Sequence, residues 1–104
     1  MHRYAFDVKS ISGEPFLTNR RLFAMSDTGV PDGIKCDEKG NVYSGCGDGI
    51  NVWSPGGVLL GKILISGGVS NFCFCGAGEI MALNETRLWR VILSPICRGA
   101  LLKL

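Results

Sequence analysis

Asp32 is the side chain of this sequence best placed to do chemistry. It lies in the tripeptide Pro31-Asp32-Gly33, directly before an apolar segment that begins at Ile34. A carboxylate can ligate a hard divalent cation or take a proton from a water molecule. The same tripeptide is also typical of tight turns, because proline sets one φ angle, aspartate accepts local hydrogen bonds and glycine tolerates a positive φ. The residue types alone therefore leave two roles open for Asp32, a functional one and a purely structural one.

An internal repeat gives Asp32 its context. Residues 33–43 and 71–81 superpose without a gap at an offset of 38 residues, which aligns Gly40 with Gly78. Units of about 40 residues built from short strands are typical of β-propeller blades. The sequence therefore predicts an all-β fold and, more specifically, a portion of a β-propeller.

The repeat also shows which residue of the other copy aligns with each candidate site residue. Asp32 aligns with Ser70, so the repeated unit does not by itself require an acid at this position. Asn71 aligns with Gly33, at the start of the first strand of the second copy. We expect Asn71 either to face the channel of the propeller, where it could contact substrate, or to cap its strand with a satisfied amide.

Short apolar segments separated by glycine and proline predict the strands and the organisation of the chain. Residues 1–28 are expected to supply the two outer strands of one blade, 29–66 a complete four-stranded antiparallel blade, and 67–104 an incomplete last blade of three strands. This amounts to about two and a half blades. The predicted strands are residues 4–8, 20–25, 34–37, 41–46, 50–54, 58–65, 71–75, 79–83 and 87–93.

Charge and hydropathy exclude several classes of partner. The 104 residues carry a net charge of +2, and Arg20-Arg21 is the only basic pair, so no nucleic-acid footprint is expected. No apolar run reaches the roughly 18–20 residues that a membrane-spanning helix needs. The first residues resemble a strand rather than a signal peptide, and we leave the compartment open.

Cysteine and tryptophan offer weaker candidates. Cys73 and Cys75 are two apart in a predicted strand and should point to the same face. They could bind a soft metal ion, but without a second cysteine pair at matching spacing we favour reduced thiols in the core. Trp53 and Trp89 could stack on a substrate, and packing between neighbouring blades is the favoured alternative.

Four segments together resemble the C-terminal part of the senescence marker protein/gluconolactonase family, most closely its fungal lactonohydrolase branch. They are residues 19–24 (NRRLFA), 29–43 (GVPDGIKCDEKGNVY), 49–57 (GINVWSPGG) and 84–91 (NETRLWRV). The resemblance implies a six-bladed propeller that binds a divalent cation, usually Ca²⁺, in its channel and hydrolyses sugar lactones. It further implies that Asp32 is a metal ligand and the candidate general base.

The resemblance also implies that the metal site is incomplete. The other protein ligands of the family, a Glu from the first blade and an Asn from a middle blade, belong to segments with no counterpart in this sequence. We therefore expect a metal-dependent sugar-lactone hydrolase at the level of the family, with this short chain lacking most of the active site. The alternatives are a non-catalytic propeller fragment and a structural module that associates with itself through uncovered blade faces.

Overall fold

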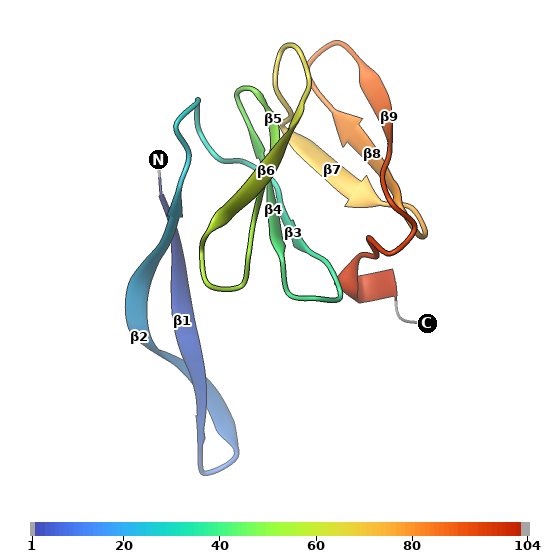
Figure 1. Ribbon diagram of the computed structural model, residues 1–104. Helices are drawn as coiled ribbons and strands as arrows, with labels where there is room; N and C mark the ends of the chain where they lie inside the picture. The colour runs from blue at the N-terminus through green and yellow to red at the C-terminus, as the bar shows by residue number, and fades with distance from the viewer. Residues whose placement is uncertain (1, 103–104) are drawn as a thin grey trace.

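The structure is a computed structural model that describes residues 2–102. It consists of three antiparallel sheets, and the described residues form no α-helix (Figure 1). Accordingly, no helix within residues 2–102 is long and apolar enough to span a membrane. The first sheet is the hairpin β1 (His2–Ile11) and β2 (Glu14–Met25); the second is β3 (Ile34–Cys36), β4 (Val42–Cys46), β5 (Gly49–Trp53) and β6 (Leu59–Leu64); the third is β7 (Asn71–Phe74), β8 (Glu79–Leu83) and β9 (Leu88–Ile92); a single 3-10 turn, η1 (Ala100–Leu102), follows.

The two repeated segments fold alike, as the sequence predicted. Strands β3 to β6 pair in sequential antiparallel order, and so do β7 to β9. Gly40 and Gly78 precede the second strand of their sheets with φ angles of 82° and 73°, a conformation that favours glycine. A Cβ at Gly78 would also lie 2.7 Å from the carbonyl oxygen of Leu93. The shared glycine is therefore a requirement of the shared turn.

The N-terminal hairpin is longer than the predicted strands 4–8 and 20–25. Ser12 and Gly13 form a two-residue turn with φ angles of 52° and 80°, as in the type I′ turns that suit β-hairpins. Pro15 was expected to help break the chain, yet it lies within β2 opposite Ser10. Both strands of a two-stranded sheet are edge strands, and proline is tolerated there. The prediction of two short strands was therefore wrong at this turn.

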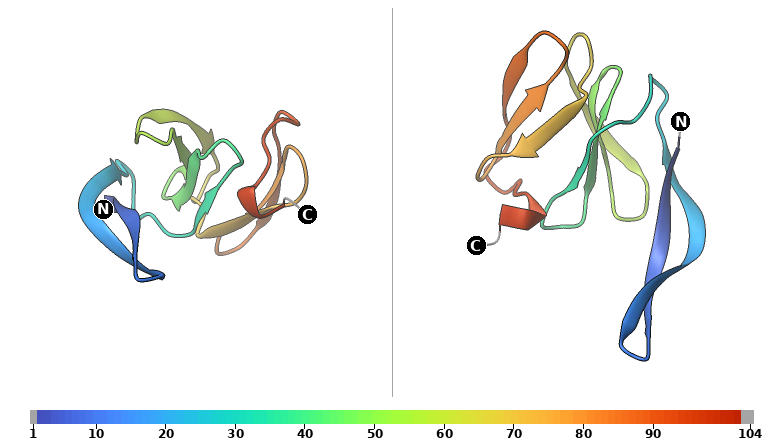
Figure 2. Two further views of the ribbon diagram at one scale, coloured as in Figure 1. Left: turned by 90° about the horizontal axis from the view of Figure 1, so that it is seen from below. Right: turned by 180° about the vertical axis from the view of Figure 1, so that it is seen from behind.

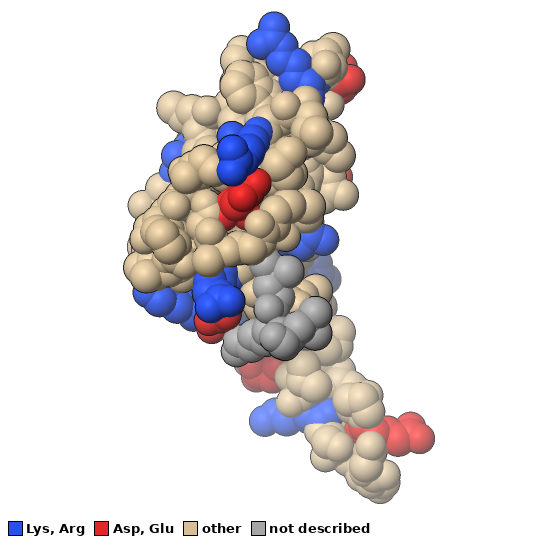
Figure 3. All heavy atoms as spheres, turned by 90° about the vertical axis from the view of Figure 1, so that its right-hand side faces the viewer, with Lys and Arg blue, Asp and Glu red and all other residues tan. Residues whose placement is uncertain are grey.

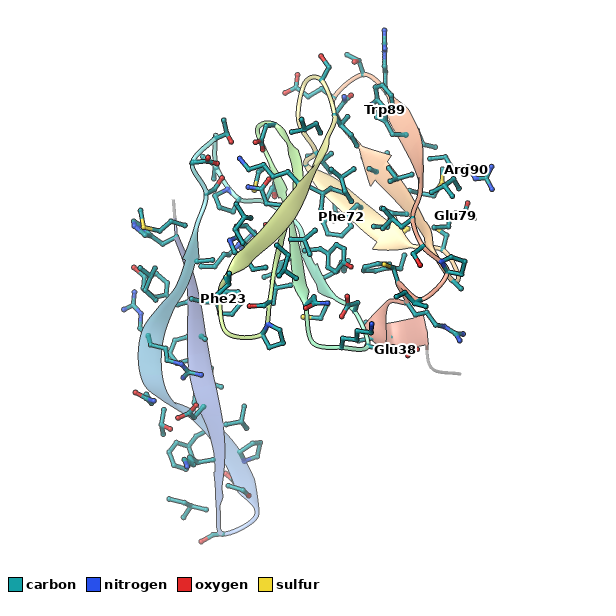
Figure 4. All side chains as sticks on the ribbon, in the orientation of Figure 1. Phe23, Glu38, Phe72, Glu79, Trp89 and Arg90 are labelled. Carbon is teal, nitrogen blue, oxygen red and sulfur yellow. The ribbon has the colours of Figure 1, made fainter. Side chains whose placement is uncertain are left out.

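The four-stranded sheet lies between the other two sheets, which fan out on either side of it (Figure 2). The face toward β7–β9 carries the main core, and Phe72 lies in it (Figure 4). The other face packs on the upper end of the hairpin through Phe23, Ala24, Cys46 and Trp53, the last only 3% exposed. Packing of both tryptophans between sheets is confirmed, since Trp89 lies against the main core. That core comprises Tyr43, Ile50, Ile65, Val69, Phe72, Ile80 and Ala82.

The segment after β9 returns to the lower ends of both large sheets. Gly99 forms an isolated bridge with Asp37, and the amide of Glu38 donates to the carbonyl of Arg98 at 2.8 Å. The amide of Gly78 donates to the carbonyl of Cys97, also at 2.8 Å. The segment thereby ties the β3–β4 turn to the β7–β8 turn. The sequence predicted no fourth strand here, which agrees with the three-stranded sheet, but it did not predict this link.

Asp37 organises the β3–β4 turn from the inside. The residue is 5% exposed, and its carboxylate accepts hydrogen bonds of 2.9–3.0 Å from the amides of Lys39 and Asn41, the Asn41 side chain and the Tyr43 hydroxyl. Burial raises the pKa of Asp37, but the hydrogen bonds from Asn41, Tyr43 and Lys39 outweigh it and hold that pKa below its ordinary value. Burial, and then the hydrogen bond to Asp37 and the charge of that carboxylate, raise the pKa of Tyr43.

We predict that Asp37→Ala lowers the free energy of unfolding by about 2–4 kcal/mol at neutral pH, because several buried donors lose their acceptor. Urea denaturation followed by tryptophan fluorescence measures it. Glu38→Ala is the matched control, since this neighbouring side chain is exposed and lies 3.6 Å from Arg98. An equal effect of the two substitutions would contradict the assigned role of Asp37.

The difference between wild type and Asp37→Ala should depend on pH. A carboxyl whose pKa is lower in the folded state stabilises the fold above the pKa of the unfolded chain. This stabilisation is lost as the pH falls through the folded pKa. The difference should thus be full above about pH 5 and shrink steadily in more acidic solution. Urea titrations at several pH values would reveal the trend, and a difference that grows in acid would overturn it.

Candidate functional site

The strands β3 and β7 begin side by side, and both sequence-predicted site residues lie at this point. The amide of Gly33 donates to the carbonyl of Ser70 at 2.9 Å, which joins the two chain segments. The side chain of Asn71 lies over Gly33, where an added Cβ would come within 2.5 Å of its Oδ1 atom. The structure therefore brings the neighbourhoods of Asp32 and Asn71 together although the two residues are 39 positions apart in the sequence.

The backbone around Asp32 is held from several directions. The amide of Asp32 donates to the carbonyl of Gly45 at 2.8 Å, and its own carbonyl accepts from the Arg3 guanidinium. The carbonyl of Gly33 accepts from the Gly45 amide at 3.0 Å and from the Ser44 hydroxyl at 3.1 Å. The start of β3 is thus fixed by β4, by the hairpin and by the segment that precedes β7.

Arg3 is a member of this site that the sequence did not indicate. It lies in β1, and its guanidinium also donates to Ser44 Oγ at 2.9 Å. Its Nε atom is buried and has no partner among the described residues. Arg3 and Ser44 are 41 residues apart and belong to no common motif. The contact depends on how the hairpin docks on the four-stranded sheet, which no local pattern encodes.

The carboxylate of Asp32 differs from that of Asp37 at the other end of β3. Asp37 is buried and accepts several hydrogen bonds, whereas the exposed Asp32 carboxylate accepts none from the described residues. An aspartate that only shapes a turn ordinarily accepts a bond from an amide two residues further on. Asp32 instead lines a hollow of about 180 Å³ together with Ser70, Asn84 and Glu85.

The described residues do not by themselves form a calcium site. They contain no cluster of three or more histidine, cysteine or acidic side chains that could hold a metal ion. The Oδ1 atom of Asn71 accepts a hydrogen bond from the Phe72 amide at 2.9 Å. This bond uses one lone pair of the amide oxygen that the sequence makes a candidate for the channel. Ca²⁺ takes about 6–8 oxygen ligands. Asp32 and Glu85, the two acidic side chains that line the smaller hollow, would supply only a part of such a coordination shell.

A larger hollow of about 550 Å³ lies at the opposite ends of β3 and β7. Ile34, Phe74 and Leu101 make its lining mainly apolar, and Cys36 and Cys73 lie at it as well. No acidic side chain lines it among the described residues. General base or hard-cation chemistry therefore fits the smaller hollow at Asp32 better than the larger one.

Cys73 and Cys75 point to the same face, as predicted, but they are not core thiols. Both are exposed, and their Sγ atoms lie 3.5 Å apart. They occupy the face of the β7–β9 sheet opposite to Phe72, and Cys73 borders the larger hollow together with β3 and η1. The Glu79–Arg90 ion pair lies on this outer face (Figure 4). The side of the molecule at β9 is largely uncharged apart from isolated basic and acidic side chains (Figure 3).

Comparison with known proteins identifies the family. The sequence model of the SMP-30/gluconolactonase/LRE-like region matches residues 2–82. The chain belongs to this family. The matched part includes the hairpin, the four-stranded sheet, Asp32 and Asn71, and it ends within β8.

Relatives in the SMP-30/gluconolactonase family include two curated proteins. The gluconolactonase of Zymomonas mobilis is 33% identical over 71 residues, which cover 64% of this chain and 19% of that protein. The lactonohydrolase oryH of Aspergillus oryzae is 32% identical over 98 residues, or 94% of this chain and 19% of the relative. The chain thus spans about a fifth of the length of these relatives.

Solved structures give the same assignment. A structure described as a gluconolactonase candidate matches 94% of this chain with a TM-score of 0.75 and 28% identity, and the match covers 32% of that protein. The gluconolactonase of Xanthomonas campestris matches 83% of this chain with a TM-score of 0.72 and 33% identity, over 29% of its length. The arrangement of sheets described above is therefore one that solved proteins described as gluconolactonases contain.

We predict that Gly33→Ala lowers the free energy of unfolding by about 1–3 kcal/mol, because the new methyl group displaces the Asn71 side chain. Gly61→Ala is the matched control, since no atom lies within 4 Å of an added Cβ there. Thermal unfolding of both variants measures the difference. A second substitution, Asn71→Ala, should recover part of the loss in Gly33→Ala, and no recovery would contradict the contact between the two residues.

Proposed function

We propose that this chain carries part of the active site of a gluconolactonase-type sugar-lactone hydrolase, in which Asp32 is a ligand of a divalent cation, Ca²⁺, and the general base. The relatives named gluconolactonase and lactonohydrolase support the class of reaction. One structural observation carries the assignment of the residue. The backbone of Asp32 is held on several sides, while its carboxylate stays exposed and unengaged by the described residues.

The proposed setting is a six-bladed β-propeller, of which this chain would form about two and a half blades. Residues 1–28 would be the outer strands of one blade, 29–66 a complete blade, and 67–104 an incomplete last blade. The arrangement of the sheets supports this proposal. Strands β4 and β5 of the middle sheet are buried, whereas apolar side chains such as Val8 in β1, Leu64 in β6 and Ile92 in β9 stay exposed. Neighbouring blades would cover these faces.

In the proposed reaction, the Asp32 carboxylate takes a proton from a water molecule while the water oxygen bonds to the lactone carbonyl carbon. The ring ester bond then breaks, the leaving alkoxide takes up the proton that Asp32 holds, and the product is the open hydroxy acid. A bound divalent cation would supply polarisation of the carbonyl group. Arg3 and Gly45 bond to the Asp32 backbone and Ser44 to the Gly33 carbonyl, so the carboxylate needs little reorganisation to take the proton. Asn71 would contact the substrate from the neighbouring strand.

The 104 residues supply too few oxygen ligands to hold Ca²⁺ firmly, and they lack the opposite side of the channel. We therefore expect this chain alone to bind Ca²⁺ weakly and to show negligible lactone hydrolysis. A form that carries the remaining blades, with the missing Glu and Asn, should hydrolyse a sugar lactone in a metal-dependent way. Calcium titration calorimetry and a pH-stat lactone assay on both forms measure these properties.

In the form with all blades, Asp32→Asn should lower kcat by about 100-fold or more, because it removes the candidate base and weakens the ligand field together. Glu14→Gln is the matched control, since Glu14 is an exposed acid beside the hairpin turn and far from the site. An unimpaired Asp32→Asn variant would overturn the assignment of the residue. Robust turnover by the 104-residue chain would overturn the proposal that its site is incomplete.

Self-association is a second candidate role, and one observation favours it. The hairpin face that carries Tyr4, Val8, Leu17 and Leu22 is mainly apolar, and Val8 and Leu17 remain 70% and 61% exposed. The Arg20 guanidinium lies over the Tyr4 ring at one end of this face. Exposed apolar patches of this kind commonly mark interaction surfaces. Two chains that bring these faces together would shield them from water. Under this proposal the chain is a structural module without a catalytic role of its own.

We predict that the wild-type chain sediments as a dimer or larger species and that Val8→Lys with Leu17→Lys shifts it toward the monomer, because charge on the apolar face opposes burial. Thr18→Lys is the control, since Thr18 pairs with Asp7 on the opposite face of the hairpin. Sedimentation velocity at several concentrations measures the distribution. A monomeric wild type, or an equal shift by the control, would contradict association through this face.

A further inference from the structure

We propose that Cys73 and Cys75 form a reversible oxidation site that reacts with small disulfides to give an intrachain disulfide. The inference does not depend on the proposed lactonase activity. It rests on three features of the structure: the distance between the two sulfur atoms, the exposure of both thiols, and the position of Cys75 just after the end of β7.

The geometry is close to what a disulfide needs. The two Sγ atoms lie 3.5 Å apart and would have to approach to about 2.05 Å. Alternate residues of an extended strand have Cα atoms about 6.4–6.8 Å apart, at the upper end of the range found for disulfides. Only a modest movement is therefore required. A bond formed at this limit is strained, and strained, exposed disulfides are readily reduced.

The chain can make this movement more easily on the Cys75 side. β7 ends at Phe74, and Cys75 follows it with one further backbone hydrogen bond, from its amide to the Glu79 carbonyl at 2.8 Å. The next residue, Gly76, has a φ of 97° and no neighbouring atom within 4 Å of an added Cβ. Cys73, by contrast, is held within β7 opposite Met81. Closure would therefore move Cys75, at the end of the ladder, and leave Cys73 in place.

The surroundings leave room for an incoming disulfide. Both thiols are exposed, and Cys73 also lines the apolar hollow of about 550 Å³ between β3 and β7. The neighbouring Cys73 thiol and then burial raise the pKa of Cys75. The two sulfur atoms lie within hydrogen-bonding distance of each other, and either can be the donor. Because Cys73 lines the hollow, it is the thiol of the pair that an incoming disulfide meets first.

The reaction proceeds in two exchange steps. The Cys73 thiolate attacks one sulfur of the small disulfide, forms a mixed disulfide and releases one thiolate. Cys75 then loses its proton and attacks the Cys73 sulfur, which closes the intrachain bond and releases the second thiolate. The two cysteines lose two protons and two electrons in total, and one small disulfide is reduced to two thiols. A dithiol reductant reverses both steps.

The test uses the 104-residue chain, oxidised glutathione as the small disulfide, and iodoacetamide to block remaining thiols. Trypsin places Cys73 and Cys75 on one peptide, residues 63–87, and Cys36 on another, residues 36–39. We expect peptide 63–87 to lose two hydrogens and to carry neither glutathione nor an alkyl group. Cys36, an exposed thiol without a close sulfur partner among the described residues, should retain glutathione. Dithiothreitol before alkylation should abolish both products.

Two single substitutions test whether the reaction depends on the Cys73–Cys75 pair rather than on the neighbouring Cys36. In Cys75→Ser, Cys73 cannot complete the second step, and we expect at least about tenfold more glutathione on peptide 63–87 than in wild type. Cys36→Ser is the matched control and should leave the product on peptide 63–87 unchanged. The inference fails if both cysteines of wild type become alkylated. It also fails if a disulfide joins peptide 63–87 to peptide 36–39, because Cys73 would then pair across the hollow with Cys36.

Discussion

The structure depends on the close approach of two strand beginnings, where the Asp32–Gly33 peptide lies between Gly45 of β4 and Ser70 just before β7. Two amides, those of Asp32 and Gly33, point in different directions and bond to different sheets, at 2.8 and 2.9 Å. The approach leaves no space for side chains at two positions. An added Cβ would lie 2.3 Å from the Val69 carbonyl oxygen at Gly45 and 2.5 Å from Asn71 Oδ1 at Gly33. Gly45 is thus required by the junction, because the opposing atom belongs to the backbone, whereas a side chain at Gly33 would displace the Asn71 side chain. The junction fixes the position of the Asp32 backbone, from which its carboxylate projects.

The junction also explains the uneven burial of the three sheets. It holds the β7–β9 sheet against one face of β3–β6, where Ile50 and Ile80 become fully buried. The hairpin covers the opposite face only with its upper end, through contacts of Arg3 and Phe23, and its lower part projects away (Figure 1). Strands β4 and β5 of the middle sheet have both faces covered. Three proposals depend on the uncovered outer faces. Neighbouring blades of a larger ring could cover them, a second copy of the chain could pack on them, and the Cys73–Cys75 pair is accessible on one of them.

Periodicity was sufficient to predict the strands, the 38-residue repeat and the antiparallel order of both large sheets, because each depends on local alternation and on turn glycines such as Gly40 and Gly78. The full length of the hairpin could not be predicted, because Pro15 is typical of a break in the chain. A proline is tolerated within a strand only where that strand is at the edge of a sheet, and the sequence does not show this. The roles of Arg3 and of residues 97–99 depend on docking between distant segments. The exposure of Cys73 and Cys75 could not be predicted either, because the strand pattern does not say which face a neighbouring sheet covers.

Neighbouring segments hold the Asp32 backbone rigidly, while its carboxylate has no hydrogen-bond partner among the described residues. Amide hydrogen exchange resolved by NMR tests whether this backbone is rigid. We predict that the amides of Asp32 and Gly33 exchange as slowly as those in the β4–β5 ladder, because both donate to carbonyl groups across the junction. The amides around the Ser12–Gly13 turn should exchange much faster. Exchange at Asp32 and Gly33 as fast as at that turn would show that the junction opens freely, and it would contradict a preorganised site.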